Sequence, residues 1–351
     1  AWFNDRAQVH VKFYSLCFAA LSPLLGSNIL SVEPVNLVCY LAILVLTYLI
    51  ARRFTDHRSA LVSAAVVALW PSLLLHTTQV LRDPLFIAAF LTLVLVLVKL
   101  IADDYEWRKG LLAGLTGAFA ALLLLMSRTD FWTVVRAMVL LSFVLFIVQA
   151  LIKKKLPAGN LVGIVLLLVM TNFVLPLPRV VENQIGVSVG TQVRDAGSPY
   201  WARVDARRRK FVIEGDNRSG SLIDRDVTFA NYSDLVKHVP RALAVGFFAP
   251  FPNMWFSAGY NVGRAGRLLA GLETAVTYAM FLLAAIFVWR HRRRVDIWVI
   301  VLTMLAGLTA LGLVVINVGT LYRMRYSFWI LLVILAIPVF TGFRNNTAKV
   351  S

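Results

Sequence analysis

The chain alternates between long apolar runs and short polar segments. Each long run is about the length that crosses a ~30 Å hydrocarbon layer as a helix. The nine runs cover residues 35–51, 60–80, 84–101, 110–126, 131–152, 160–177, 268–289, 297–318 and 327–342. The pattern predicts an all-α polytopic membrane protein with about nine transmembrane helices.

Two segments depart from this pattern. Residues 10–25 are apolar but short and contain Lys12 and Pro23, which favours an interfacial helix. Residues 178–267 hold both charge signs and only short apolar pieces, which is typical of an extramembrane subdomain. Four parts are expected: an outer segment with an interfacial helix (1–34), a six-helix membrane bundle (35–177), an extracytoplasmic loop subdomain (178–267), and three C-terminal membrane helices with a cytoplasmic tail (268–351).

Composition supports the membrane class. Of the 351 residues 59% are hydrophobic and only 15% are charged, well below the roughly 25% of soluble domains. The formal net charge of +17 does not indicate a nucleic-acid partner, because most of the cations sit in short clusters between apolar runs. Cys17 and Cys39 both lie in apolar segments and give neither a disulfide framework nor a metal-ligand spacing.

The cation clusters predict the orientation of the chain. Because the chain changes side with each span, five basic segments fall on the same side of the membrane. The positive-inside rule assigns that side to the cytoplasm. They contain Arg52, Arg53 and Arg58; Arg108 and Lys109; Lys153, Lys154 and Lys155; Arg290, Arg292, Arg293 and Arg294; and Arg344 and Lys349. The outer side receives the long loop and three tight turns, at Arg82, Arg128 and 322–325. The N-terminus is then outside, which implies a missing upstream span or a removed signal.

Polar and ionisable side chains inside or at the edges of spans concentrate toward the outer face. They are His76, Gln79, Arg82, Asp83, Arg128, Asp130, Arg136, Glu273, Asn317, Arg323 and Arg325. Several arginines at headgroup depth suit a bound phosphate or diphosphate, since the guanidinium fork matches phosphate oxygens. A nearby carboxylate could be the base for an acceptor hydroxyl.

Structural interpretations stay open for several of these residues. Asp83 before Pro84 also suits a helix start. Arg128 with Asp130 fits a turn pair, and Arg136 fits a structural bridge to Glu273 or Asp130. His76 fits a hydrogen-bonded bundle histidine. The basic run 207–210 favours a solvated face.

Residues 12–90 resemble the GT-C glycosyltransferases, in particular the bacterial branch similar to protein O-mannosyltransferases and lipid A aminoarabinose transferases (family 39 type). The resemblance rests on the segment FYSLCFAALSPLLGSN, the span PVNLVCYLAILVLTYLIARR, the run WPSLLLHTTQV and the LRDP turn. The C-terminal GTLYRMRYSFWILLVILAIP resembles the GNxRYRxP-like segment that opens the last spans of such proteins.

The resemblance implies an inverting enzyme in the bacterial inner (plasma) membrane. It moves a sugar from a polyprenyl-phosphate carrier to a glycan, lipid or protein acceptor on the outer face. The family's catalytic acid lies in the first outer loop, which leaves Asp5 as the corresponding carboxylate or its neighbour in an N-terminally truncated chain. Asp83 falls where the family often has an acidic residue, and Arg323 and Arg325 fall near its donor phosphate. No cofactor is certain, and a divalent cation is an open option.

The combined hypothesis assigns Arg82, Arg128, Arg323 and Arg325 to the donor phosphate and Asp83 or Asp5 to the acceptor. Asp130, Arg136, Glu273 and His76 are expected as supporting charges of the cavity. A polymerase or ligase of lipid-linked polysaccharide would also need outer arginines and a large outer loop, so it stays an alternative. A transporter or flippase is disfavoured, because the sequence shows no internal repeat and its charges lie at one face.

Overall fold

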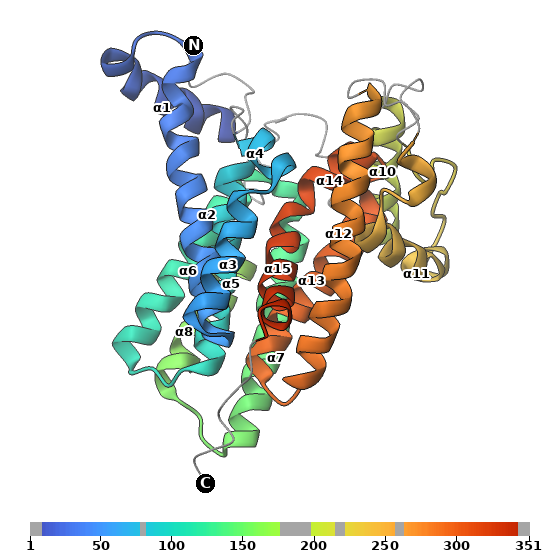
Figure 1. The fold of residues 1–351 in the computed structure, drawn as a ribbon. Helices are drawn as coiled ribbons and strands as arrows, with labels where there is room; N and C mark the ends of the chain where they lie inside the picture. The colour runs from blue at the N-terminus through green and yellow to red at the C-terminus, as the bar shows by residue number, and fades with distance from the viewer. Residues whose placement is uncertain (1–8, 78–81, 176–197, 215–221, 257–262, 343–351) are drawn as a thin grey trace.

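The fold is a bundle of long helices with short helices gathered at one end (Figure 1). The computed structural model describes residues 9–77, 82–175, 198–214, 222–256 and 263–342, and it contains no β-strand within them. The helices of the first half are α1 (Val9–Leu25), η1 (Ile29–Val32), α2 (Glu33–Phe54), α3 (His57–Ala68), α4 (Pro71–Thr77), α5 (Asp83–Ala102), α6 (Trp107–Ser127), η2 (Thr129–Phe131), α7 (Trp132–Lys153), α8 (Ala158–Val169) and η3 (Met170–Val174). Those of the second half are α10 (Tyr200–Glu214), α11 (Tyr232–Phe248), η5 (Pro252–Met254), α12 (Gly263–Arg290), α13 (Val295–Val314), α14 (Val318–Met324) and α15 (Tyr326–Phe340).

The predicted all-α polytopic class is confirmed, whereas the count of nine spans is not. Within the described residues, six helices are long and apolar enough to cross a membrane, or up to eight if each of two bent pairs is one span. The run predicted at 60–80 is broken, with α3 and α4 meeting at a 63° bend before Pro71. The residue before a proline is disfavoured in the α-helical conformation, which accounts for the break there. The predicted span at 160–177 is α8 followed by a π-helical turn, η3.

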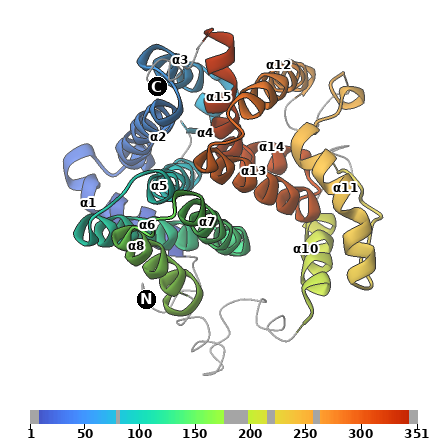
Figure 2. The ribbon, with the colours of Figure 1, turned by 90° about the horizontal axis from the view of Figure 1, so that it is seen from below.

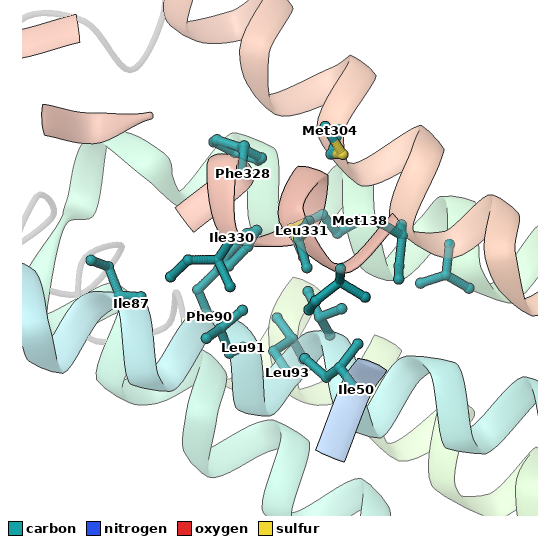
Figure 3. Packing of buried hydrophobic residues seen from close by; sticks show 14 of the residues in the cluster. Ile50, Ile87, Phe90, Leu91, Leu93, Met138, Met304, Phe328, Ile330 and Leu331 are labelled. Carbon is teal, nitrogen blue, oxygen red and sulfur yellow. The ribbon is translucent and has the colours of Figure 1, made fainter. Parts of the chain in front are cut away.

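Two helices, α5 and α15, form the centre of the bundle. Both are apolar all round, which is the pattern of a helix buried on every side. Helix α5 packs against α2, α6, α7 and α13, and α15 packs against α2, α3, α5 and α12. Phe90 of α5 meets Phe328 of α15 edge to face, with ring centroids 5.1 Å apart (Figure 3). The C-terminal helices therefore share one hydrophobic core with the first bundle.

The contact between α6 and α8 is made through glycines. A Cβ at Gly110 would lie 1.8 Å from the carbonyl oxygen of Gly159, and one at Gly163 would lie 2.6 Å from that of Gly110. No side chain fits at such distances, so the backbones touch directly. Small residues that allow close approach are the common way in which helices associate in membranes.

Four of the five basic segments predicted to be cytoplasmic lie together at one end of the bundle, and the fifth, with Arg344 and Lys349, lies outside the described residues. Arg53 at the end of α2 pairs with Asp103 after α5, and Lys155 pairs with Asp104 at 2.9 Å. Arg294 before α13 donates to the carbonyl of Arg53 at 3.2 Å. Helices α1, α4 and α14 lie at the opposite end (Figure 1). This arrangement agrees with the sidedness that the cation clusters predict.

The part of the predicted loop subdomain that the structure describes packs on α13. Helix α11 approaches so closely that a Cβ at Gly246 would lie 2.1 Å from the carbonyl oxygen of Leu308, and one at Gly312 would lie 1.9 Å from that of Ala242. On α10 the basic run 207–210 is the expected solvated face at Arg209 and Lys210, which are exposed, but not at Arg208. The guanidinium of Arg208 is buried and donates to the Leu313 carbonyl at 2.9 Å and to the Asp224 carbonyl at 2.8 Å.

Candidate functional site

Three arginines from three separate turns gather around Asp83. The Arg128 Nη2 atom lies 2.5 Å from Asp83 Oδ1, and both side chains are only 7% exposed. The Arg323 Nε atom lies 3.0 Å from Asp83 Oδ2, within ion-pair distance but not aligned as a hydrogen bond. Arg82 is the residue before Asp83, and its Nη1 atom donates to the carbonyl of Ser127 at 3.3 Å. This set is called the Asp83 cluster below.

The cluster is positioned by helix ends. Asp83 is the first residue of α5 and stands before Pro84, so its carboxylate lies at the positive end of that helix. Arg128 stands between α6 and η2, and its guanidinium lies 5.5 Å from the centre of the Phe86 ring. Arg323 belongs to the last turn of α14. Two tight turns of the first half and one of the second half therefore meet at a single carboxylate.

The cluster carries more positive than negative charge. Two guanidinium groups, those of Arg128 and Arg323, pair with one carboxylate, and Arg82 adds a third positive charge beside them. Burial together with the charge of Arg128 lowers the pKa of Arg82 from its usual value. The buried Nε of Arg128 has no hydrogen-bond partner in the described part of the chain. A group of arginines with spare donors and excess positive charge is suited to bind a phosphate.

Next to the cluster, Glu273 of α12 connects α4 and α14. It is only 4% exposed, and its Oε1 accepts the backbone N–H of Ser72 at 3.0 Å. Its Oε2 accepts the hydroxyls of Ser72 and Tyr322. Tyr322 also lines a small cavity with Trp70, Thr277, Arg325, Tyr326 and Trp329.

Several predicted site residues lie outside the Asp83 cluster. The buried Arg325 donates to the backbone carbonyls of Phe247 and Ala249, at 3.1 and 2.6 Å. His76 bonds the Ser72 carbonyl through Nδ1 at 2.6 Å, and its ring lies against Tyr326. Asp5 is not among the described residues.

The side-chain pairs that the sequence suggested for Arg128 and Arg136 are formed with other partners in the structure. Asp130 is exposed and lies 3.6 Å from Arg207 of α10. Arg128 therefore pairs with Asp83 instead of its neighbour in the turn. Arg136 is exposed and donates from Nε to Asn172 Oδ1 at 2.9 Å, so it bridges α7 to η3 and not to Glu273 or Asp130.

Sequence reasoning missed the partners of Glu273. Neither Ser72 nor Tyr322 belongs to a recognisable sequence motif, and both are far from Glu273 along the chain. The one available signal is Pro71, which marks a helix start whose first N–H groups need an acceptor from elsewhere.

The described residues contain no group of three or more His, Cys, Asp or Glu side chains that could hold a metal ion.

Comparison with known proteins gives one match. Residues 13–174 match the family model described as dolichyl-phosphate-mannose-protein mannosyltransferase, which is 162 of the 351 residues. Neither a curated protein nor a solved structure matches the chain. The matched region contains α5, Arg82, Asp83 and Arg128, and it agrees with the resemblance seen in the sequence. Residues 13–174 are thus similar to the dolichyl-phosphate-mannose-protein mannosyltransferase family, and this match supports a multi-pass membrane glycosyltransferase of the GT-C type that uses a lipid-linked sugar donor.

Proposed function

We propose that the protein transfers a sugar from a polyprenyl-phosphate carrier to an acceptor at the outer face of a bacterial plasma membrane, with inversion. Arg82, Arg128 and Arg323 bind the phosphate of the carrier. The observation that supports this is the convergence of the Arg128 and Arg323 guanidinium groups on one carboxylate, with Arg82 beside it, at the end of the bundle opposite to the basic loops. Arg325 is left out of the phosphate site, because its guanidinium is used by two backbone carbonyls.

The chemistry that such a site performs is a single displacement at the anomeric carbon. The acceptor oxygen forms a bond to that carbon, and the bond from the carbon to the phosphate oxygen breaks. The acceptor proton goes to a carboxylate base, and the carrier leaves as polyprenyl phosphate. Negative charge grows on the phosphate as its bond to the sugar breaks. Preorganised guanidinium groups stabilise that charge most strongly in the transition state.

Within this proposal Asp83 holds the arginines in place. Both of its oxygens lie next to guanidinium nitrogens, as an anchor for the arginines requires. The base is then a carboxylate outside the cluster, and Asp5 is the candidate that the family resemblance offers.

The experiment that tests the phosphate site compares two lipids that differ only in the phosphate. The affinity of the purified protein for polyprenyl phosphate and for the neutral polyprenol is measured in detergent. We expect the wild type to prefer the phosphate. Arg323→Gln should lose about 10- to 100-fold of that preference, the loss expected when a hydrogen bond to a charged group is removed.

Arg241→Gln is the matched control. Arg241 also pairs with an aspartate, Asp224 at 3.0 Å, but it does so in the loop subdomain and outside the cluster. Its preference for the phosphate should equal that of the wild type. Equal preference in Arg323→Gln and in the wild type would contradict the phosphate site. Arg323 is 31% exposed, so its replacement is less disruptive to folding than that of the buried Arg128.

A further inference from the structure

Two helices of the bundle are broken, and their short halves lie beside the Asp83 cluster. Helix α4 is bent from α3 by 63°, and α14 is bent from α15 by 53°. Helix α14 carries Arg323, and α4 precedes Arg82 and Asp83 along the chain. The relative placement of α4 and α14 therefore affects where the arginines of the cluster lie.

Glu273 contacts both short halves with one carboxylate. Its contacts to Ser72 reach the start of α4, where a free backbone N–H needs an acceptor. Its contact to Tyr322 reaches α14 at the residue directly before Arg323. Glu273 itself stands in α12, a long helix that packs along α15. The carboxylate is thus a fixed point from which both segments are held.

The burial of Glu273 makes these contacts depend on one another. An ionised carboxylate inside an apolar bundle is costly unless it is hydrogen-bonded or paired. In the described part of the chain its contacts are hydroxyl and backbone N–H donors, and no cation lies within ion-pair distance. Moving either α4 or α14 away would leave the buried side chain with fewer hydrogen-bond partners, so Glu273 favours the arrangement in which both segments stay in place.

Aromatic contacts fix the same segments from the side. The ring of Trp70, at the bend before α4, packs against that of Trp329 of α15, with centroids 4.3 Å apart and planes tilted by 36°. The ring of His76 lies 5.5 Å from that of Tyr326, which in turn contacts Tyr322 at 5.7 Å. These contacts give α4 and α14 a common packing surface, and Glu273 adds the polar link between them.

We propose that Glu273 is a positioning residue, which clamps α4 to α14 and so sets the place of Arg323 in the cluster. This inference rests on the proposed function in one respect, namely that Arg323 binds the phosphate of the carrier. Glu273 itself does not touch the lipid. Its loss should act on the phosphate through Arg323.

The first test replaces the carboxyl group of Glu273 with an amide. In Glu273→Gln one of the two acceptor oxygens becomes a donor, so a hydroxyl partner must turn from donor to acceptor, and the hydrogen bonds of a carboxylate become weaker amide ones. At least one arm of the clamp is therefore weakened. We expect the Kd for polyprenyl phosphate to rise about tenfold, with no change in the Kd for polyprenol. Tyr322→Phe removes the α14 arm alone and should give a similar loss, and it carries the test if Glu273→Gln fails to fold.

A double-mutant cycle separates positioning from mere stabilisation. In the Arg323→Gln background the mutation Glu273→Gln should have little further effect on the Kd for polyprenyl phosphate. The guanidinium group through which Glu273 acts on the phosphate is already absent there. Thr274→Val is the control. Thr274 is the neighbouring residue of α12 and is fully buried, but among the described residues its hydroxyl donates only to the Ala270 carbonyl of its own helix. Its Kd should equal that of the wild type.

Two results would overturn the inference. One is an unchanged Kd for polyprenyl phosphate in both Glu273→Gln and Tyr322→Phe. The other is full additivity in the cycle, which would mean that Glu273 does not act through Arg323. If Arg323→Gln alone binds polyprenyl phosphate as well as the wild type does, the proposed phosphate site fails and this inference fails with it.

Discussion

At the scale of single residues, the role of Asp83 can be tested by replacing it with asparagine, which has the same shape but no charge. Asp83→Asn removes the counter-charge of the buried Arg128, and breaking a buried ion pair from one side costs about 3–5 kcal/mol. We expect a lower free energy of unfolding. We also expect polyprenyl phosphate to raise the Tm of this variant more than that of the wild type, because the phosphate replaces the lost anion. Thermal unfolding in detergent, with and without the lipid, measures both.

Asp130→Asn is the control for this prediction. Asp130 also follows an outer turn, but it is 59% exposed and its contact to Arg207 is 3.6 Å long. An exposed ion pair of this kind contributes about 0–1 kcal/mol, so its stability should hardly change. If Asp83→Asn keeps the stability of the wild type and loses all sugar transfer, Asp83 is a base and not an anchor.

The sequence predicted which arginines lie at the same end of the bundle better than it predicted their partners. Hydropathy and the positive-inside rule place Arg82, Arg128 and Arg323 on one side without any knowledge of packing. The pairing of Arg128 with Asp83 joins positions 45 residues apart. Sequence proximity favoured Asp130 instead. Only the packing of α5 on α6 brings the distant carboxylate closer than the near one.

At the scale of helices, hydropathy found the apolar runs and missed their breaks. A run such as 60–80 has the composition of a span on both sides of Pro71, so an average over the run cannot reveal the 63° bend. The signals for the breaks are local: Pro71 begins α4, and Asn317 caps α14 by accepting the N–H of Thr320 at 3.1 Å. The candidate site depends on these breaks, because α14 brings Arg323 to Asp83.

The contact between α6 and α8 gives a prediction on stability. Gly110→Ala would place its Cβ inside the Gly159 carbonyl group, so the helices must separate. We expect a loss of about 1–3 kcal/mol, as for other overpacked interiors, measured by the midpoint of unfolding in denaturant. Leu112→Ala on the same helix is the control, since Leu112 is 65% exposed on the outside of the bundle. Equal midpoints for Gly110→Ala and Leu112→Ala would mean that α6 and α8 are not in contact.

At the scale of the molecule, the two halves of the chain form one bundle. Helix α13 packs on α5 and α7, and α15 packs on α2, α3 and α5 (Figure 2). The family match ends at residue 174, yet Arg323 from the unmatched half completes the cluster that Arg82, Asp83 and Arg128 begin. The second half is therefore needed for the proposed phosphate site as much as the matched half is.

The orientation of this bundle in the membrane is the last prediction. Lys155 lies at the end that carries the basic loops, and Asp226 lies in the loop subdomain; both are exposed. In a background with Cys17 and Cys39 replaced by Ala, we expect Asp226→Cys to react with a membrane-impermeant thiol reagent on intact cells. Lys155→Cys should react only after the membrane is opened, because a loop rich in Lys and Arg stays on the cytoplasmic side. The reverse pattern would put the Asp83 cluster on the cytoplasmic face, and transfer to an outer acceptor would then be ruled out.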